Sequence, residues 1–341
     1  MGLLERRLFD RMPVDGEAPS KDADPRIQAQ LSIKEPDPRE AAPGIRRKIE
    51  CVATIAADHG SSISSAETLL LLPSGTFESI EELESFVETD PSLSGQLAVH
   101  CGQIVFRNGG NFGVRAPQLN RSVGRSQLAQ SFTDRFAASC PWIRFVGISG
   151  STAYAAAKPS DDIDLFIVTR RNRVWITLLV GMTAARIHRM KDPTRPVLCL
   201  NRILEEDVCR DEFRKPQDAL FAREALSLRV LEGFTFYREL VESAPWMKRI
   251  FPELYRKATV VDEGRSQVAR RDRGRLWSFA NVAAFTVLAA YLPIVGLWRN
   301  RRLVRQGNLT ARYRTIIERG FFAYESRKYE NLRRTYREVF D

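Results

Sequence analysis

The residues best suited to chemistry lie in one short stretch, residues 145–169. An apolar run ends there in Gly150-Ser151, ten residues follow, and Asp162 and Asp164 then open a second apolar run. Side chains alternate between the faces of a strand, so the two carboxylates would point the same way, about 7 Å apart. Mg²⁺ prefers carboxylate oxygens and completes its coordination with water and phosphate oxygens. The pair is therefore a candidate catalytic site for one or two Mg²⁺ ions, with Mn²⁺ as the alternative.

The Gly-Ser pair adds a candidate phosphate site. A glycine directly after a strand lets the backbone approach a ligand closely. Backbone N–H groups at the start of a following helix, together with the Ser151 hydroxyl, can bind phosphate oxygens. Ser149 either joins them or caps the helix. The Gly-Ser pair and the Asp-Ile-Asp triplet are each common alone. Their joint placement at two apolar strands, residues 142–148 and 162–169, indicates a site for a nucleoside triphosphate and its metal ions.

Residues 147–168 resemble the signature of the nucleotidyltransferase superfamily, which includes DNA polymerase beta, kanamycin nucleotidyltransferase and the minimal nucleotidyltransferase antitoxins. That signature is a strand, a Gly-Ser pair, a connector, and Asp-apolar-Asp in a second strand. The resemblance implies Mg²⁺-dependent transfer of a nucleoside monophosphate from an NTP, with release of pyrophosphate. By that match Gly150 and Ser151 bind the triphosphate, and Asp162 and Asp164 bind metal. ATP is the first choice of donor, and a tRNA or a protein is the acceptor considered.

Members of this superfamily usually carry a third carboxylate on a nearby strand, and the chain departs from that pattern. The next predicted strand, residues 196–204, holds no carboxylate, and its Asn201 cannot accept a proton at neutral pH. The candidates for the third carboxylate follow it directly: Glu205, Glu206 and Asp207. Because the base is unassigned, a catalytically weak or inactive nucleotide-binding scaffold is the alternative to an active enzyme.

The chain divides into four regions, one of which contains the motif, and together they predict an α+β fold. Residues 1–44 are charged and proline-rich, so they cannot bury enough apolar surface to fold and we expect disorder. Residues 45–115 predict a winged-helix-like domain, and residues 125–210 a nucleotidyltransferase-like catalytic core with a small mixed sheet. Residues 211–341 read as a helical region. A looser set of bacterial and archaeal nucleotidyltransferase-domain proteins has a similar arrangement.

The small N-terminal domain is predicted from helix starts followed by a hairpin. Capping boxes begin at Ser64 and Ser79, and two short strands are expected at residues 97–100 and 104–107. Because the whole chain has a net charge of +10, this domain leaves an RNA-binding regulator open as a further function. The helix after Ser79 is rich in glutamate, which repels phosphates, so a packing or dimerisation module is favoured slightly.

Residues 276–298 carry no charge, and arginines flank both ends of the segment. Its length suffices to span a bilayer, and Trp277, Tyr291 and Trp298 lie towards its ends, as in membrane interfaces. The alternative is a buried or groove-filling helix. The N-terminus has no apolar core of the signal-peptide type. We therefore expect a cytoplasmic protein, with attachment to the cytoplasmic membrane through 276–298 as the open question.

Overall fold

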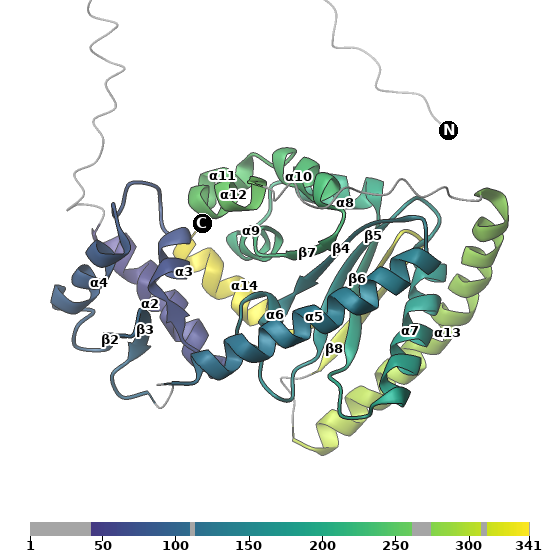
Figure 1. Ribbon diagram of the computed structural model, residues 1–341, viewed down its shortest axis with the longest axis horizontal. Helices are drawn as coiled ribbons and strands as arrows, with labels where there is room; N and C mark the ends of the chain where they lie inside the picture. Colours follow the sequence, from purple (N-terminus) through teal and green to yellow (C-terminus); the bar gives the residue numbers. More distant parts are fainter. Residues whose placement is uncertain (1–41, 110–112, 261–273, 308–311, 341) are drawn as a thin grey trace, which may run out of the picture. The chain divides into compact units, whose positions relative to one another are not determined.

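The computed structural model describes residues 42–109, 113–260, 274–307 and 312–340. Most of the predicted disordered segment, up to residue 41, lies outside the described residues. The fold is α+β with a mixed sheet, as predicted (Figure 1).

Six strands form the central sheet, in the order β7-β4-β5-β6-β9-β8. Only β5 and β6 run parallel, and the other neighbours are antiparallel. The strands are β4 (Ile143–Ser149), β5 (Ile163–Thr169), β6 (Leu198–Glu205), β7 (Arg229–Glu232), β8 (Tyr313–Glu318) and β9 (Phe321–Ser326).

The C-terminal region, predicted to be helical, supplies three of these strands, β7, β8 and β9. Residues 321–326, FFAYES, have the aromatic content of a strand, and Gly320 separates them from β8. The surrounding arginines and tyrosines hid that signal. The central sheet is therefore completed by segments from outside residues 125–210.

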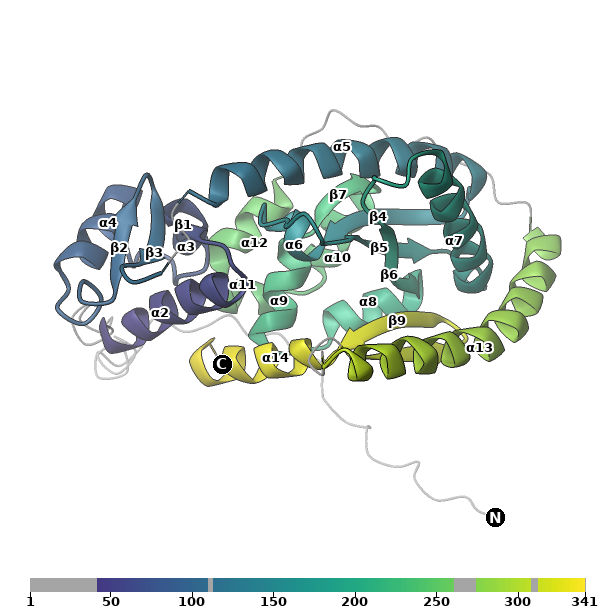
Figure 2. The ribbon, with the colours of Figure 1, turned by 90° about the horizontal axis from the view of Figure 1, so that it is seen from below.

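Helices cover both faces of the central sheet (Figures 1 and 2). Strand β5 has apolar side chains on both faces. Ile163, Leu165 and Ile167 are fully buried in one helical layer, and Val168 is buried in the other. The first layer contains α5 (Arg115–Ser139), α7 (Val174–Lys191) and α13 (Gly274–Arg305). The second contains α8 (Glu206–Arg214), α9 (Ala219–Leu226), α10 (Phe234–Glu242), α11 (Trp246–Ile250), α12 (Pro252–Thr259) and α14 (Arg327–Phe340).

The N-terminal elements form a second, three-stranded antiparallel sheet with three helices. They are α2 (Ala42–Asp58), β1 (Ile63–Ser64), α3 (Ser65–Leu70), α4 (Ile80–Thr89), β2 (Leu97–His100) and β3 (Gln103–Phe106). The capping box at Ser64 is confirmed, since its side chain and that of Glu67 bond reciprocally to backbone N–H groups. At Ser79 only half of the box forms, because the Glu82 carboxylate accepts from the Glu78 N–H instead.

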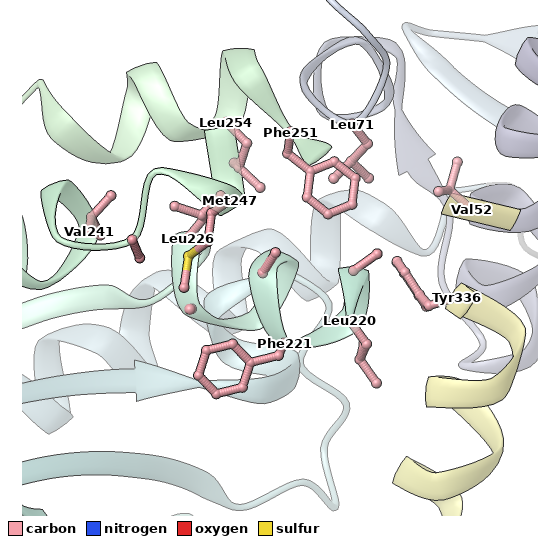
Figure 3. Close-up of a cluster of buried hydrophobic side chains, with 14 of the residues drawn as sticks. Val52, Leu71, Leu220, Phe221, Leu226, Val241, Met247, Phe251, Leu254 and Tyr336 are labelled. Carbon is pink, nitrogen blue, oxygen red and sulfur yellow. The ribbon is translucent and has the colours of Figure 1, made fainter. Parts of the chain in front are cut away.

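This small sheet shares a hydrophobic core with the second helical layer. Figure 3 shows Val52 and Leu71 of the N-terminal elements in the same buried cluster as Phe221, Phe251 and Tyr336. Burying a large aromatic side chain contributes about 2–3 kcal/mol, so this shared cluster holds the N-terminal elements against α9, α12 and α14. The wall that they form there becomes part of the cavity described next.

Candidate functional site

Antiparallel pairing of β4 and β5 brings the two halves of the sequence motif together. Ser149, the last residue of β4, lies opposite Asp164 near the start of β5. Gly150 follows with φ +66°, and a Cβ at that position would lie 2.8 Å from Asp164 Oδ2. Both the left-handed backbone and the approach of the carboxylate therefore favour glycine. The predicted helix after the glycine is a single turn, α6 (Gly150–Ala153), in which Ser151 is half-buried.

Asp162 and Asp164 differ in exposure although they belong to one pattern. Asp162 is exposed just before β5, whereas Asp164 is half-buried, and the intervening Ile163 is buried in the opposite layer. Burial, followed by the nearby carboxylates of Asp162 and Glu224, raises the pKa of Asp164 to about 7. Neither aspartate forms a salt bridge with another described residue.

Arginines of α5 hold the connector between the glycine turn and the aspartates. Arg115 donates to the Tyr154 carbonyl at 3.0 Å, Arg121 to that of Ala157 at 2.8 Å, and Arg125 to that of Lys158 at 2.7 Å. Three charged donors thus fix a loop that has no regular structure of its own. The long helix α5 is therefore the support on which the motif is positioned.

A carboxylate that the sequence did not single out joins the site from α9. Glu224 accepts a hydrogen bond from the Tyr154 hydroxyl at 2.8 Å, and the Arg223 guanidinium lies 4.8 Å from the Tyr154 ring centroid. Burial raises the pKa of Glu224 as well. The surrounding sequence, ALFAREAL, is that of an ordinary helix, so no local signal could have identified it.

The predicted third carboxylates lie at the opposite end of the sheet. Asp164 pairs with Cys199 of β6, and Thr169 with Glu205, which puts Glu205 about 17–20 Å from Asp164 along the strands. Glu205 accepts from the Asn172 N–H at 2.8 Å, and Glu206 pairs with Arg144 at 3.2 Å. Asp207 follows in the first turn of α8. The structure therefore does not bring these three residues to the aspartates.

Cys199 takes the position on β6 beside Asp164. Its thiol donates a hydrogen bond to that carboxylate, and burial next to Asp164 and Asp162 raises the pKa of the thiol. A thiol that stays protonated neither ligates a metal nor accepts a proton at neutral pH. Asn201 lies at the register shift of β6 and faces no residue of β5 in the pairing.

A cavity of about 1070 Å³ contains both halves of the motif. Its wall includes Gly150, Ser151, Asp162, Asp164 and Glu224, and on the side of the N-terminal elements His59, Ser62 and Glu67. The volume is at the upper end of the range for small-molecule sites, so the cavity has room for a nucleotide together with part of a second substrate.

Basic groups gather on another part of the same wall. A Cβ on Gly60 would lie 3.3 Å from Lys158 Nζ, so this lysine lies against the end of α2. Burial and the neighbouring Lys158 lower the pKa of Lys328. Burial, followed by the charges of both lysines, lowers the pKa of His59. Two neighbouring ammonium groups and an imidazole in one wall suit an anionic ligand.

The donor set fits Mg²⁺ as part of a shared site. The described residues hold no group of three or more His, Cys, Asp or Glu side chains arranged around one point, so the protein alone offers two carboxylates. Asp164 stands among other carboxylates, and a cation there would relieve the repulsion that raises its pKa. Phosphate oxygens would have to supply further ligands, as is usual for Mg²⁺.

Comparison of the chain with protein-family models, curated protein sequences and solved structures found no match. The functional argument therefore rests on the residues and geometry of the site.

Proposed function

We propose that the chain is a Mg²⁺-dependent nucleotidyltransferase, which transfers a nucleoside monophosphate from an NTP to an acceptor and releases pyrophosphate. One observation carries the proposal: the Gly150 turn and the Asp164 carboxylate meet across the β4–β5 pair so closely that any side chain at position 150 would displace the carboxylate. A phosphate-binding turn and a metal-binding carboxylate in contact form the minimal arrangement for holding a triphosphate with its cation.

Each wall of the cavity has a role in this mechanism. The Gly150-Ser151 backbone and the Ser151 hydroxyl bind phosphate oxygens, while Lys158 and Lys328 balance their charge. Asp162 and Asp164 would hold Mg²⁺, which neutralises charge on the phosphates and the leaving group when bound. The acceptor oxygen forms a bond to the α-phosphorus as the bond from that phosphorus to the bridging oxygen breaks, and the electron pair leaves with pyrophosphate. Positioning and charge neutralisation supply most of the rate enhancement.

Glu224 is the best candidate for the base. Among the other described carboxylates of the cavity, Glu67 is paired with Arg115, and Asp161 accepts from the Lys158 N–H at 2.9 Å. Glu224 accepts only from the neutral Tyr154 hydroxyl in a direct side-chain hydrogen bond, and its raised pKa brings it closer to the working pH of a general base. The proton of the acceptor hydroxyl would pass to this carboxylate.

The N-terminal elements follow the order helix, strand, helix, helix, strand, strand, and we assign them as winged-helix-like. The second and third helices carry no basic residue, and α4 exposes Glu81, Glu82 and Glu88. His59 and Ser62 instead line the cavity. These features favour a domain that closes the substrate site, and they argue against an RNA-binding regulator.

Transfer of label from α-³²P-NTPs to a cell extract tests the proposal. We expect Mg²⁺-dependent labelling that falls at least about a thousandfold in Asp164→Asn and about a hundredfold in Glu224→Gln. Glu206→Gln is the matched control and should stay within about twofold of wild type.

Two outcomes would redirect the assignment. NTP binding that needs Asp164 without any label transfer would identify an inactive nucleotide-binding scaffold, for which the thiol at Cys199 would be the physical reason. Neither binding nor transfer with any NTP would end the nucleotidyltransferase assignment. RNA binding with a steep salt dependence and indifference to Asp164→Asn would then favour the regulator.

A further inference from the structure

Helix α13 has two apolar faces, and the described residues cover only one of them. Ala284, Leu288 and Leu292 are buried in the layer with α5 and α7. The opposite face exposes large apolar side chains at helical spacing, each 50–76% accessible: Leu276, Phe279, Val282, Val287, Tyr291, Ile294, Leu297 and Trp298. A surface helix of a globular domain normally turns polar residues outward, so this outer face, residues 276–298, is built to contact something apolar.

Polar contacts fasten the inner face of α13 to the core. Asn281 Oδ1 accepts from the Trp175 and Ile176 N–H groups at 2.9 and 3.1 Å, which caps the start of α7. Arg173 donates to Ser278 Oγ at 2.9 Å, and the Asn300 amide exchanges two hydrogen bonds with the Tyr313 backbone. Moving α13 into a bilayer as a span would break these bonds and expose the cluster around Trp142 and Trp175.

The charges next to the outer face identify its partner. Residues 273–317 contain eight arginines and no Asp, Glu or Lys. Arg299, Arg301, Arg302 and Arg305 are exposed at the end of α13, and Arg186 and Arg189 are exposed on α7 beside Ile187 and Met190. A second copy of the chain seated on this face would bring the arginines of residues 273–317 against one another, and that segment contains no carboxylate to neutralise them. Anionic lipid headgroups do neutralise them.

We propose that α13 lies flat on an anionic lipid surface, with its outer face in the apolar boundary, its arginines among the headgroups, and its inner face still packed on the sheet. This geometry accounts for the basic residues at both ends of the uncharged segment. A spanning helix would need more basic residues at one end than at the other to set its orientation. At 1.5 Å per residue, the 23 uncharged residues form a strip about 35 Å long in the plane of the lipid. The inference is independent of the proposed reaction.

The same arrangement puts the lipid surface near the candidate site. Arg299 and Arg189, from the ends of α13 and α7, are close enough to oppose the rise in the pKa of Asp162. Arg299 also lies 5.6 Å from the Tyr313 ring centroid. The opening beside Asp162 would therefore lie close to the headgroups.

Co-sedimentation of the full chain with vesicles tests this proposal. We expect binding to phosphatidylcholine vesicles with about 30% phosphatidylglycerol, and at least about tenfold weaker binding to pure phosphatidylcholine or in about 1 M NaCl. Phe279→Glu with Ile294→Glu should weaken binding roughly a hundredfold. Leu119→Glu is the control, because Leu119 is exposed on α5, outside this face. Circular dichroism and thermal melting establish that each variant is folded.

Three outcomes would overturn the proposal. Equal binding to neutral and anionic vesicles that resists both salt and alkaline carbonate would indicate a spanning helix. A wild-type dimer without vesicle binding, split to monomers by the double glutamate variant, would mean that a second copy covers the face. Absence of both vesicle binding and self-association in the folded wild-type protein would leave the lipid contact without support.

Discussion

The two ends of the parallel β5–β6 pair both place a glycine against a carboxylate, with opposite electrostatic surroundings. At one end Gly150 contacts Asp164, whose neighbours are the carboxylates of Asp162 and Glu224. At the other end a Cβ on Gly320 would lie 3.1 Å from Glu205 Cδ, and Glu205 accepts from the Asn172 N–H. Burial raises the pKa at both ends. At Asp164 the carboxylates of Asp162 and Glu224 add to the rise and the Cys199 thiol opposes it, whereas at Glu205 the Asn172 N–H and Arg171 oppose the rise and only Asp207 adds to it.

The difference separates a carboxylate with polar partners inside the protein from one that is proposed to bind a cation. Glu205 and Glu206 have polar partners within the protein, the Asn172 N–H and the Arg144 guanidinium. Asp164 stands among other carboxylates and has no salt bridge to another described residue, which costs stability, and it is the carboxylate proposed to bind a cation. The following predictions test this contrast, beginning with the largest effect.

Removing the Asp164 charge should stabilise the metal-free protein at alkaline pH. Its pKa of about 7 in the fold lies above the ordinary aspartate value of 3.8, so the fold favours the protonated form. The stability that this provides is present at low pH and is lost as pH rises from about 4 to about 7. Asp164→Asn should therefore raise the free energy of unfolding by up to about 4 kcal/mol at pH 8 and by little below pH 4. Urea melts at both pH values measure it, and a larger gain at the acidic pH would contradict the assignment.

Substituting the two glycines should have different effects at the two ends of the sheet. Gly150→Ala forces a left-handed backbone onto a side chain and pushes Asp164 away, so we expect a loss of about 1–3 kcal/mol in stability. NTP affinity should fall about a hundredfold. Gly320→Ala, with no positive φ, should leave affinity within about threefold. Isothermal titration with Mg²⁺ and NTP measures both affinities, and equal losses would remove the distinction.

Metal binding should weaken as pH falls below about 7. Asp164 must lose its proton to ligate a cation, so the affinity for Mn²⁺, used as a spectroscopic probe, should fall about tenfold per pH unit between about pH 6.5 and pH 5. Electron paramagnetic resonance of free Mn²⁺ measures this. An affinity that stays constant from pH 8 to pH 5 would exclude Asp164 as a ligand.

The smallest effect is expected at Glu206. Its pair with Arg144 is partly exposed, so Glu206→Gln should cost less than about 1 kcal/mol and should not alter Mn²⁺ binding. Thermal melting and the same resonance titration measure the two quantities. A large loss of metal affinity would restore the carboxylates after β6 as site residues.

Local patterns in the sequence predicted the motif but not the rest of the site. Strand alternation around Ile163 and the glycine after residues 142–148 depend on neighbours in the chain, and the structure contains both strands within one residue of their predicted ends. Glu224 depends on how α9 packs against the β4–β5 end, some 60 residues later in the chain, and nothing in its own helix marks it. Glu205 directly follows the predicted strand, but at the end of that strand remote from Asp164. The parallel pairing puts Cys199, at the other end of β6, beside Asp164.

The sequence by itself determined the α+β class, the glycine turn paired with Asp162 and Asp164, the capped start of α3, and the uncharged segment 276–298. Each of these follows from periodicity, capping or side-chain type over a few residues. Tertiary structure alone decided that β8 and β9 complete the sheet, that Glu224 rather than Glu205 accompanies the aspartates, and that one face of α13 is fastened to α7. Those outcomes depend on contacts between residues far apart in the chain, where register and packing select one partner among many that are chemically equivalent.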